Sequence, residues 1–129
     1  MITTTPLPPP APAMDPDDLA RLFVERANAG DLEGLVALYE PDAVLAVMGE
    51  DEPAVGHDAI RAVYTRMLQK FDKFPPTVPA ATLRQGDLAL TSSKLRNGAV
   101  TAEVARRRPD GSWRWILDQP VIAREPRDA

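Results

Sequence analysis

Two carboxylates, Glu103 and Asp118, carry the chemistry that this sequence could perform. The turn signals before and after Glu103, Asn97-Gly98 and Asp110-Gly111, are typical of two-residue β-hairpin loops, because both central positions of such loops favour positive φ. Loops of that length would place Ser92 opposite Glu103, and Glu103 opposite Asp118. Directly opposed side chains lie about 5 Å apart, where like charges are destabilising. The two carboxylates are therefore either exposed to solvent without a function or part of a functional site.

If the two carboxylates are buried, they cannot both ionise cheaply, and the pKa of one of them should rise. In this register Lys94 is diagonal to Glu103, so it would hold Glu103 ionised and leave Asp118 to carry the proton. The hydroxyl of Ser92 lies beside Glu103. Such a row suits proton transfer on a small carbonyl or enol compound, and it suits hydrogen bonding to a polar ligand equally well. We therefore predict that Glu103 and Asp118 are catalytic and that Ser92 and Lys94 bind the ligand.

The composition excludes several classes of protein. The chain has 129 residues and a net charge of −4, which fits one domain and argues against a nucleic-acid partner. It has no cysteine and one histidine, so disulfides and multi-histidine metal sites are excluded. No segment approaches the roughly 20 apolar residues of a membrane span, and the N-terminus lacks the apolar centre of a secretory signal. We expect a cytoplasmic protein without membrane contact, metal or cofactor.

The order of elements predicts helices first and a sheet afterwards, which is the α+β class. Five prolines in the first 13 residues predict a disordered arm over residues 1–13, before a domain over 14–124 and a tail over 125–129. Apolar spacing and capping residues predict helices over about 15–30, 31–40 and 58–71. Strands are predicted over 43–48, 80–85, 88–96, 99–108 and 112–123.

Four further side chains are predicted to contact a ligand. Tyr39 and Tyr64 should pack in the core with their hydroxyls at the edge of a pocket. Met67 belongs to the apolar stripe of the third helix, and Ile116 lies on the strand face that carries Asp118 in the predicted register.

The runs NAGDLEGLVALYEPDAVL, VGHDAIRAVY and DGSWRWILDQPV, in that order, resemble the nuclear transport factor 2-like superfamily, in its SnoaL-like and ketosteroid-isomerase-like branch. The resemblance covers roughly residues 15–122. It implies a cone in which three N-terminal helices fold over a curved antiparallel sheet and leave a deep pocket, usually in a homodimer. Members of this superfamily include isomerases, cyclases, dehydratases and proteins without a known reaction.

The resemblance to ketosteroid isomerase itself holds at one of three functional positions. Val47 stands where that enzyme has its catalytic base, and Phe23 stands where it has its oxyanion-hole tyrosine. Neither side chain can move a proton. Glu103 falls at the position of the protonated aspartate, a carboxylic acid that an apolar site keeps neutral. Steroid isomerisation by the same mechanism is therefore not expected.

The two faces of the last hairpin leave two interpretations open. In the predicted register one face carries Glu103 and Asp118, and the other carries Trp113, Trp115 and Leu117. Hydrophobicity alone makes the tryptophan face the core, whereas the resemblance makes it the homodimer interface and gives the carboxylates the pocket. We favour the second interpretation, which predicts a small-molecule pocket protein that could act as an isomerase, cyclase or dehydratase of a small apolar carbonyl compound. The alternative is a non-catalytic ligand-binding or dimerisation module.

Overall fold

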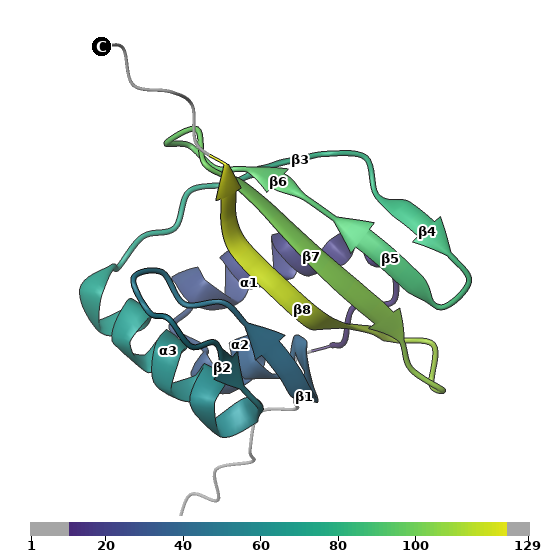
Figure 1. Cartoon of the computed structure of the whole chain (residues 1–129), viewed down its shortest axis with the longest axis horizontal. Helices are drawn as coiled ribbons and strands as arrows, with labels where there is room; N and C mark the ends of the chain where they lie inside the picture. Colours follow the sequence, from purple (N-terminus) through teal and green to yellow (C-terminus); the bar gives the residue numbers. More distant parts are fainter. Residues whose placement is uncertain (1–10, 124–129) are drawn as a thin grey trace, which may run out of the picture.

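The structure is a computed structural model, and it describes residues 11–123. Three helices lie behind and beside an eight-stranded sheet (Figure 1). The helices are α1 (Asp18–Asn28), α2 (Leu32–Val36) and α3 (His57–Lys70). The strands are β1 (Tyr39–Leu45), β2 (Ala54–Val55), β3 (Val78–Pro79), β4 (Leu83–Gln85), β5 (Leu88–Thr91), β6 (Ser93–Lys94), β7 (Val100–Arg107) and β8 (Trp113–Ala123).

The predicted α+β class is confirmed, with one correction to the sheet. The strand order is β2-β1-β8-β7-β5-β4, and the pairs along it are antiparallel except β1 with β8, which run parallel. The sheet is therefore mixed. The parallel pair is possible because most of the chain, from β2 to β7, lies between β1 and β8 in the sequence. The helices cover one face of the sheet, and we call this covered side the inner face and the opposite side the outer face (Figure 1).

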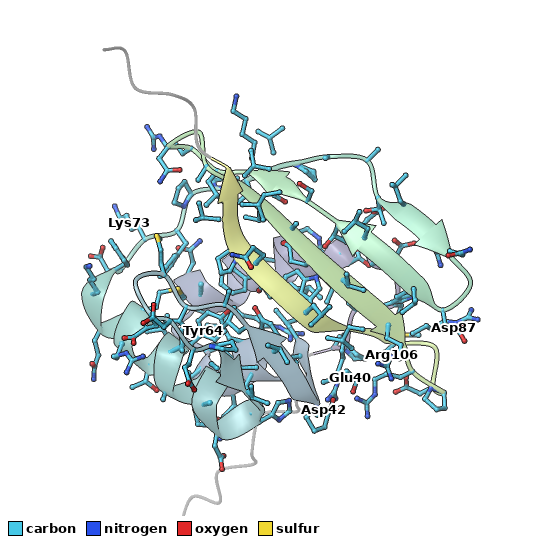
Figure 2. All side chains as sticks on the ribbon, viewed as in Figure 1. Glu40, Asp42, Tyr64, Lys73, Asp87 and Arg106 are labelled. Carbon is cyan, nitrogen blue, oxygen red and sulfur yellow. The ribbon has the colours of Figure 1, made fainter. Side chains whose placement is uncertain are left out.

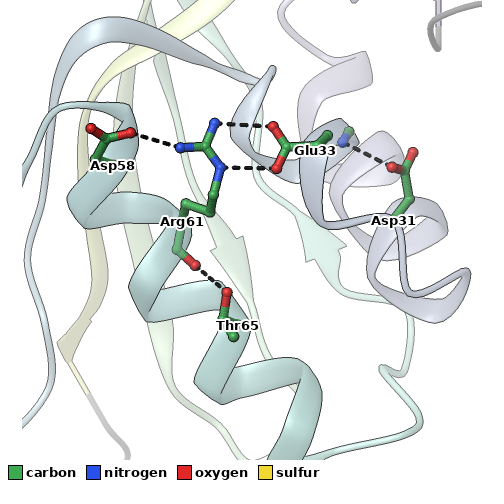
Figure 3. Close-up of polar contacts among 6 residues, drawn as sticks. Asp31, Glu33, Asp58, Arg61 and Thr65 are labelled. Atoms are coloured by element: carbon green, nitrogen blue, oxygen red, sulfur yellow. Dashed lines mark hydrogen bonds and ion pairs between the residues drawn. The ribbon is translucent and has the colours of Figure 1, made fainter.

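Local interactions fix the helices against one another. The side chain of Asp31 caps α2 by accepting a hydrogen bond from the backbone N–H of Gly34 at 2.9 Å. Arg61 on α3 binds both carboxylate oxygens of Glu33 on α2, at 2.9 and 3.0 Å, and also donates to Asp58 at 2.8 Å (Figure 3). This arrangement joins α2 to α3.

The sequence pattern predicted that Tyr39 ends the second helix. In the structure Tyr39 instead begins strand β1. Helix α2 ends at Val36, and Tyr39 pairs with Trp115 of β8. Tertiary packing overrides the helical spacing here, because the Tyr39 ring is buried between α3 and the sheet in contact with Tyr64 and Trp115.

The N-terminal segment is anchored from Ala11 onward. Buried Arg26 on α1 donates to the carbonyl oxygen of Ala11 at 2.6 Å and to that of Gly34 at 2.7 Å. Ala13 is buried and accepts a hydrogen bond from the backbone N–H of Trp113 at 2.7 Å. The end of the expected arm thus lies in the core, while residues 1–10 and the expected tail at 125–129 fall outside the described residues.

Both hairpin loops have three residues, not the two that were predicted. The backbone N–H of Leu95 donates to Ala99, and that of Arg108 donates to Ser112, each at 2.7 Å. Only Gly98 and Gly111 have positive φ in these loops, at 86° and 87°, whereas a two-residue type I′ loop would need it at the preceding residue as well. Each loop therefore shifts the pairing that follows it by one residue.

The shift has opposite outcomes in the two hairpins. In the first hairpin it persists, so Glu103 pairs with Thr91, and the predicted pairing with Ser92 is wrong. In the second hairpin the register shifts back by one residue at Ile116, which has no partner on β7. Glu103 pairs with Asp118, as predicted, but through a β-bulge that cancels the effect of the longer loop.

The same bulge overturns the predicted faces of β8. Trp113 and Trp115 lie before the bulge and are buried with Ala105 and Glu103 on the inner face. Leu117 lies after it, on the outer face, and is 49% exposed. A homodimer interface built from all three side chains is therefore excluded, because both indole rings belong to the core of one subunit.

None of the described helices is long and apolar enough to cross a membrane.

Candidate functional site

A chain of three hydroxyl and carboxyl groups lies inside the fold, between α3 and the sheet. Tyr64, labelled in Figure 2, comes from α3. Tyr39 comes from the start of β1 and Asp118 from the middle of β8. The hydroxyl oxygens of the two tyrosines are 2.5 Å apart, and the Tyr39 hydroxyl donates to the Oδ2 atom of Asp118 at 2.5 Å. Since Tyr39 has one hydroxyl proton, which it gives to Asp118, Tyr64 donates to Tyr39. The protons thus point along the chain towards the carboxylate.

Glu103 stands beside this chain, on the strand next to Asp118. The Thr101 hydroxyl donates to its two carboxylate oxygens at 3.0 and 3.1 Å, and Thr91, its partner on the next strand, lowers its pKa. Trp115 donates its indole N–H to the Thr91 hydroxyl at 3.2 Å. Strand alternation explains this grouping, because the paired residues Thr91, Glu103 and Asp118 share one face.

Burial raises the pKa of both carboxyl groups. The pKa of Glu103 rises to about 8, first because the group is removed from water and second because the charge of Asp118 lies nearby. The hydroxyls of Thr101 and Thr91 oppose this rise. Burial raises the pKa of Asp118 to about 6, and the hydrogen bond from Tyr39 opposes that rise. Near pH 7 the pair therefore holds one proton, on Glu103, and Asp118 is ionised.

The position of Lys94 removes the basis of the predicted roles. The prediction gave the proton to Asp118, because Lys94 was expected beside Glu103. Lys94 instead pairs with Val100 on the outer face, where it is exposed. The ionised group is the carboxylate that has the tyrosine donor, and the protonated group is the one that faces only neutral hydroxyls and the charge of Asp118.

The two tyrosines stay protonated. Burial, followed by the nearby charge of Asp118, raises the pKa of both phenols well above 10. Tyr39 and Tyr64 can therefore donate or relay a hydrogen bond but cannot serve as bases.

The structure brings some of the predicted ligand-binding residues to the carboxylates and leaves others apart. Tyr39 and Tyr64 join the cluster through their hydroxyls, while Met67 is half-buried and packs against the core. Ile116 is half-buried at the bulge. Ser92 lies on the other side of the sheet from Glu103 and donates to the backbone carbonyl of Thr101 at 2.7 Å. Ser92 and Lys94 are therefore not part of this cluster.

Sequence reasoning missed three members of the cluster. Thr91 was missed because the predicted register placed Ser92 opposite Glu103. Trp115 was missed because the bulge, which was not predicted, turns it to the face of Glu103. Phe23, which was considered only as a lost tyrosine, packs on Tyr64 and Trp115 with ring centroids 5.5 and 6.3 Å away. The three-residue loop between Thr91 and Glu103 could have been inferred, because a glycine after a type I turn is the next most common hairpin connection.

A hollow lies mainly on the outer side of the sheet. It has a volume of about 590 Å³ and is bordered by the β1–β2 loop and by apolar side chains of the outer face. Glu103 and Asp118 contribute to its lining, but their hydrogen bonds point to the inner face, towards Thr101 and Tyr39. Within residues 11–123, no three histidine, aspartate or glutamate side chains gather closely enough to hold a metal ion.

The chain belongs to the SnoaL-like domain family, which matches residues 20–120. This family is part of the nuclear transport factor 2-like superfamily, as the sequence motifs indicated. Among curated proteins, no sequence matches this chain.

Solved structures show the same fold at low sequence identity. A candidate calcium/calmodulin-dependent protein kinase type II association domain from Thiobacillus denitrificans is 19% identical, with a TM-score of 0.70, over 84% of this chain and 93% of that one. A ketosteroid isomerase-like protein from Erwinia carotovora is 21% identical, with a TM-score of 0.64, over 79% and 88%. A nuclear transport factor 2-like protein from Novosphingobium aromaticivorans, with a cystatin-like fold, is 20% identical, with a TM-score of 0.63, over 78% and 75%. These likenesses establish the fold alone.

Proposed function

We propose that this protein binds a small apolar carbonyl compound at the inner-face cluster and moves a proton on it, as an isomerase, cyclase or dehydratase would. The observation that carries the proposal is the pair of adjacent carboxyl groups with separated pKa values, about 8 for Glu103 and about 6 for Asp118. Two titratable groups whose environments push their pKa values apart provide an acid and a base at the same pH.

The proposed roles follow from the protonation states. Glu103, neutral near pH 7, donates a hydrogen bond to the carbonyl oxygen of the substrate. Asp118 takes a proton from the adjacent carbon, the electron pair of that bond moves towards the oxygen, and an enol forms as Glu103 gives up its proton. Tyr39, with Tyr64 behind it, supports the charged form of Asp118 before the transfer. Return of the proton to a different carbon would complete an isomerisation.

The residues next to the carboxyl groups favour an apolar ligand. Phe23, Tyr64 and Trp115 form an aromatic wall with ring centroids 5.5 and 6.3 Å apart, and half-buried Met67 belongs to the same core. We assign Met67 and Ile116 to the apolar side of the binding site, because both are half-buried and can move aside more easily than the fully buried core residues.

Hydrogen–deuterium exchange on a simple ketone tests the proposal without knowledge of the substrate. With 2-cyclohexenone in deuterated buffer, proton NMR should show exchange at the α-carbon that the wild-type protein accelerates. Asp118→Asn, which has no base at this position, should lose 10²-fold or more of the acceleration, on the order expected for general-base catalysis. Asp42→Asn, at an exposed aspartate of β1, is the matched control. Exchange that is equal with Asp118→Asn and wild type would contradict the catalytic role.

The alternative, a non-catalytic dimerisation module, is favoured by a different observation. An apolar row crosses the outer face of the sheet, one residue from each strand, through Leu83, Leu90, Val104, Leu117, Val44 and Val55. Leu83, Leu90, Leu117 and Val55 are 45–66% exposed. Contiguous apolar patches of this kind usually mark an interface on a soluble protein.

We therefore also propose a homodimer through the outer face, with this row in place of the tryptophans that the sequence indicated. Sedimentation equilibrium at micromolar concentration should give twice the mass of the chain, and Leu117→Asp should give the mass of one chain. A wild-type monomer at that concentration would contradict this proposal and leave the enzymatic proposal intact.

A further inference from the structure

Residues 71–77, which we call the connecting segment, join the end of α3 to β3 and pass beside the end of α1 (Figure 1). Lys73, labelled in Figure 2, marks this segment at the end of the molecule where α1 and α3 both finish. Most side chains of the segment are exposed, and only Phe74 and Thr77 are half-buried. Phe74 is therefore the large side chain through which the segment contacts the core.

One polar side chain holds the connecting segment to the helices. The amide of Asn28, the last residue of α1, donates to the carbonyl oxygen of Phe74 at 2.9 Å and accepts from its backbone N–H at 2.7 Å. This reciprocal pairing imitates the hydrogen bonds between two residues of neighbouring strands. In the part of the chain that the structure describes, Phe74 is the only residue of 72–77 whose backbone forms a hydrogen bond.

Two prolines after Phe74 limit what else the segment can form. Pro75 and Pro76 fix their own φ angles, and each disfavours the helical conformation in the residue before it. Neither has a backbone N–H that could donate another hydrogen bond. Regions with few hydrogen bonds and few buried side chains are the parts of a protein that open at the lowest cost in free energy. We therefore expect the connecting segment to open more easily than the helices on either side.

Apolar side chains lead along α3 from this segment to the site. One face of the helix, at the spacing i, i+3, i+4 and i+7, carries Tyr64, Met67, Leu68 and Phe71. Exposure increases along this face, from 5% at Tyr64, through half-buried Met67 and Leu68, to 51% at Phe71. The ring centroid of Phe74 lies 6.3 Å from that of Phe71. Phe74 thus lies at the exposed end of an apolar path that leads from solvent to the tyrosines of the site.

The aromatic side of the inner-face cluster is closed in the structure. Tyr39, Tyr64, Glu103 and Trp115 are at most 6% exposed. An apolar ligand can therefore reach these side chains only when part of the protein around them moves, as the lids of many active sites do.

We propose that Phe74, held by Asn28, closes an entrance to the inner-face cluster, and that release of this contact admits an apolar ligand along α3 as far as Tyr64. The inference rests on the proposed function, because it assigns a route to the same site. Phe74 is then a specificity-determining residue, since its ring occupies the end of the path where the far end of a long ligand would lie. Asn28 is a positioning residue that acts through Phe74.

Labelling of a single introduced thiol measures the opening of this entrance without a substrate. The chain has no cysteine, so Met67→Cys places one thiol on the path. Its rate of reaction with 4,4′-dithiodipyridine, a neutral aromatic disulfide, depends on how often the path is open. In this background Asn28→Ala and Phe74→Ala should each raise the rate at least about threefold, because the contact that opposes opening is lost. Asn28→Asp keeps the acceptor for the Phe74 N–H but loses the donor, so its rate should lie between.

Two control variants in the same background separate this opening from other effects. Lys73→Ala changes an exposed side chain of the connecting segment and leaves the contact of Asn28 with Phe74 in place, so the labelling rate should not change. Val36→Ala truncates a side chain of α2 that is 2% exposed, and it lowers the overall stability. It should also leave the rate unchanged, because labelling through a local opening does not require global unfolding. Thermal melting checks that each variant is folded.

Ketones of different length test the role of Phe74 in specificity. The ketone 4-phenylcyclohexanone extends beyond 2-cyclohexenone by an aromatic ring. Phe74→Ala, in the otherwise wild-type chain, should raise kcat/KM for hydrogen–deuterium exchange on the longer ketone, relative to the shorter one, by about tenfold or more, because the apolar path gains room. Leu83→Ala, at an exposed apolar residue of β4, is the matched control and should leave this ratio unchanged.

The outcomes separate this inference from the proposed function. Labelling rates that do not respond to the substitutions of Asn28 and Phe74 would overturn the entrance, and so would an equal increase in Val36→Ala. An unchanged ketone ratio in Phe74→Ala would overturn the role in specificity. Labelling that responds as expected in a protein that exchanges no ketone would support the entrance and contradict the proposed reaction. Exchange by a protein whose labelling does not respond would contradict the entrance alone.

Discussion

The two faces of the sheet distribute polarity in opposite ways. The inner face, away from water, carries two carboxyl groups, one bound by the Tyr39 hydroxyl and the other by the Thr101 hydroxyl. The outer face, in contact with water, carries a continuous apolar row. For a protein that only needed to fold, the reverse distribution would be more stable, because buried ionisable groups and exposed apolar surface both cost free energy.

The comparison indicates that each face has a role besides folding. Buried carboxyl groups with raised pKa values are common at functional sites, where they are retained at some cost in stability. Exposed apolar rows are common at interfaces. Mutations on the inner face should therefore change stability and its dependence on pH, whereas mutations on the outer face should change assembly.

The largest expected contrast is between two neighbours on β8, Trp115 on the inner face and Leu117 on the outer face. Trp115→Ala should lower the free energy of unfolding by about 3–5 kcal/mol, because it removes a fully packed ring. Leu117→Ala should lower the stability of the single chain by less than about 1 kcal/mol, since its side chain is half exposed. Urea unfolding of dilute protein, followed by circular dichroism, measures both. Similar losses in the two variants would contradict the assignment of the faces.

The next contrast concerns pH. The pKa of Glu103 is raised from 4.5 to about 8 by folding, so the folded state binds more protons than the unfolded state between these values. The stabilising contribution is complete below pH 4.5 and is lost as the pH rises through 8, so the wild type should be less stable at pH 8 than at pH 5 by on the order of 3 kcal/mol. Asp118, raised from 3.8 to about 6, adds a decline of the same sign at lower pH.

Glu103→Gln isolates the larger of these two effects. The amide keeps the shape of the protonated acid but does not titrate, so the loss of stability between pH 6 and pH 8 should become small. Urea unfolding at a series of pH values measures it, and Glu52→Gln in the exposed acidic loop is the matched control. A wild-type stability that is constant from pH 5 to pH 8 would show that Glu103 is solvated.

The smallest contrast is within the hydrogen-bonded chain. Tyr39→Phe removes the donor to Asp118, whereas Tyr64→Phe removes only the group behind it. Both variants should raise the pKa of Asp118, the first more than the second, and Tyr64→Phe should lower the stability by about 1 kcal/mol. Carbon-detected NMR titration of the aspartate carboxyl gives the pKa. An unchanged pKa in Tyr39→Phe would contradict the chain of hydrogen bonds.

The register of the last three strands illustrates how far sequence reasoning reached. The pairing of Glu103 with Asp118 was predicted correctly, although the loop that leads to it has three residues, because a bulge at Ile116 restored the register. The pairing of Ser92 was wrong, since no bulge follows the first loop. Turn residues indicate that a hairpin forms, but loop length and bulges depend on twist and packing across the whole sheet.

The sequence by itself determined the α+β class and the helices and strands near their observed positions. These depend on apolar spacing, capping and turn residues, which act over a few positions along the chain. Only the tertiary structure decided that Trp115 belongs with Glu103, that Thr91 replaces Ser92, and that Lys94 lies on the face opposite to Glu103. Each of these depends on which face a strand turns to the helices, and a single extra residue in a strand reverses that face.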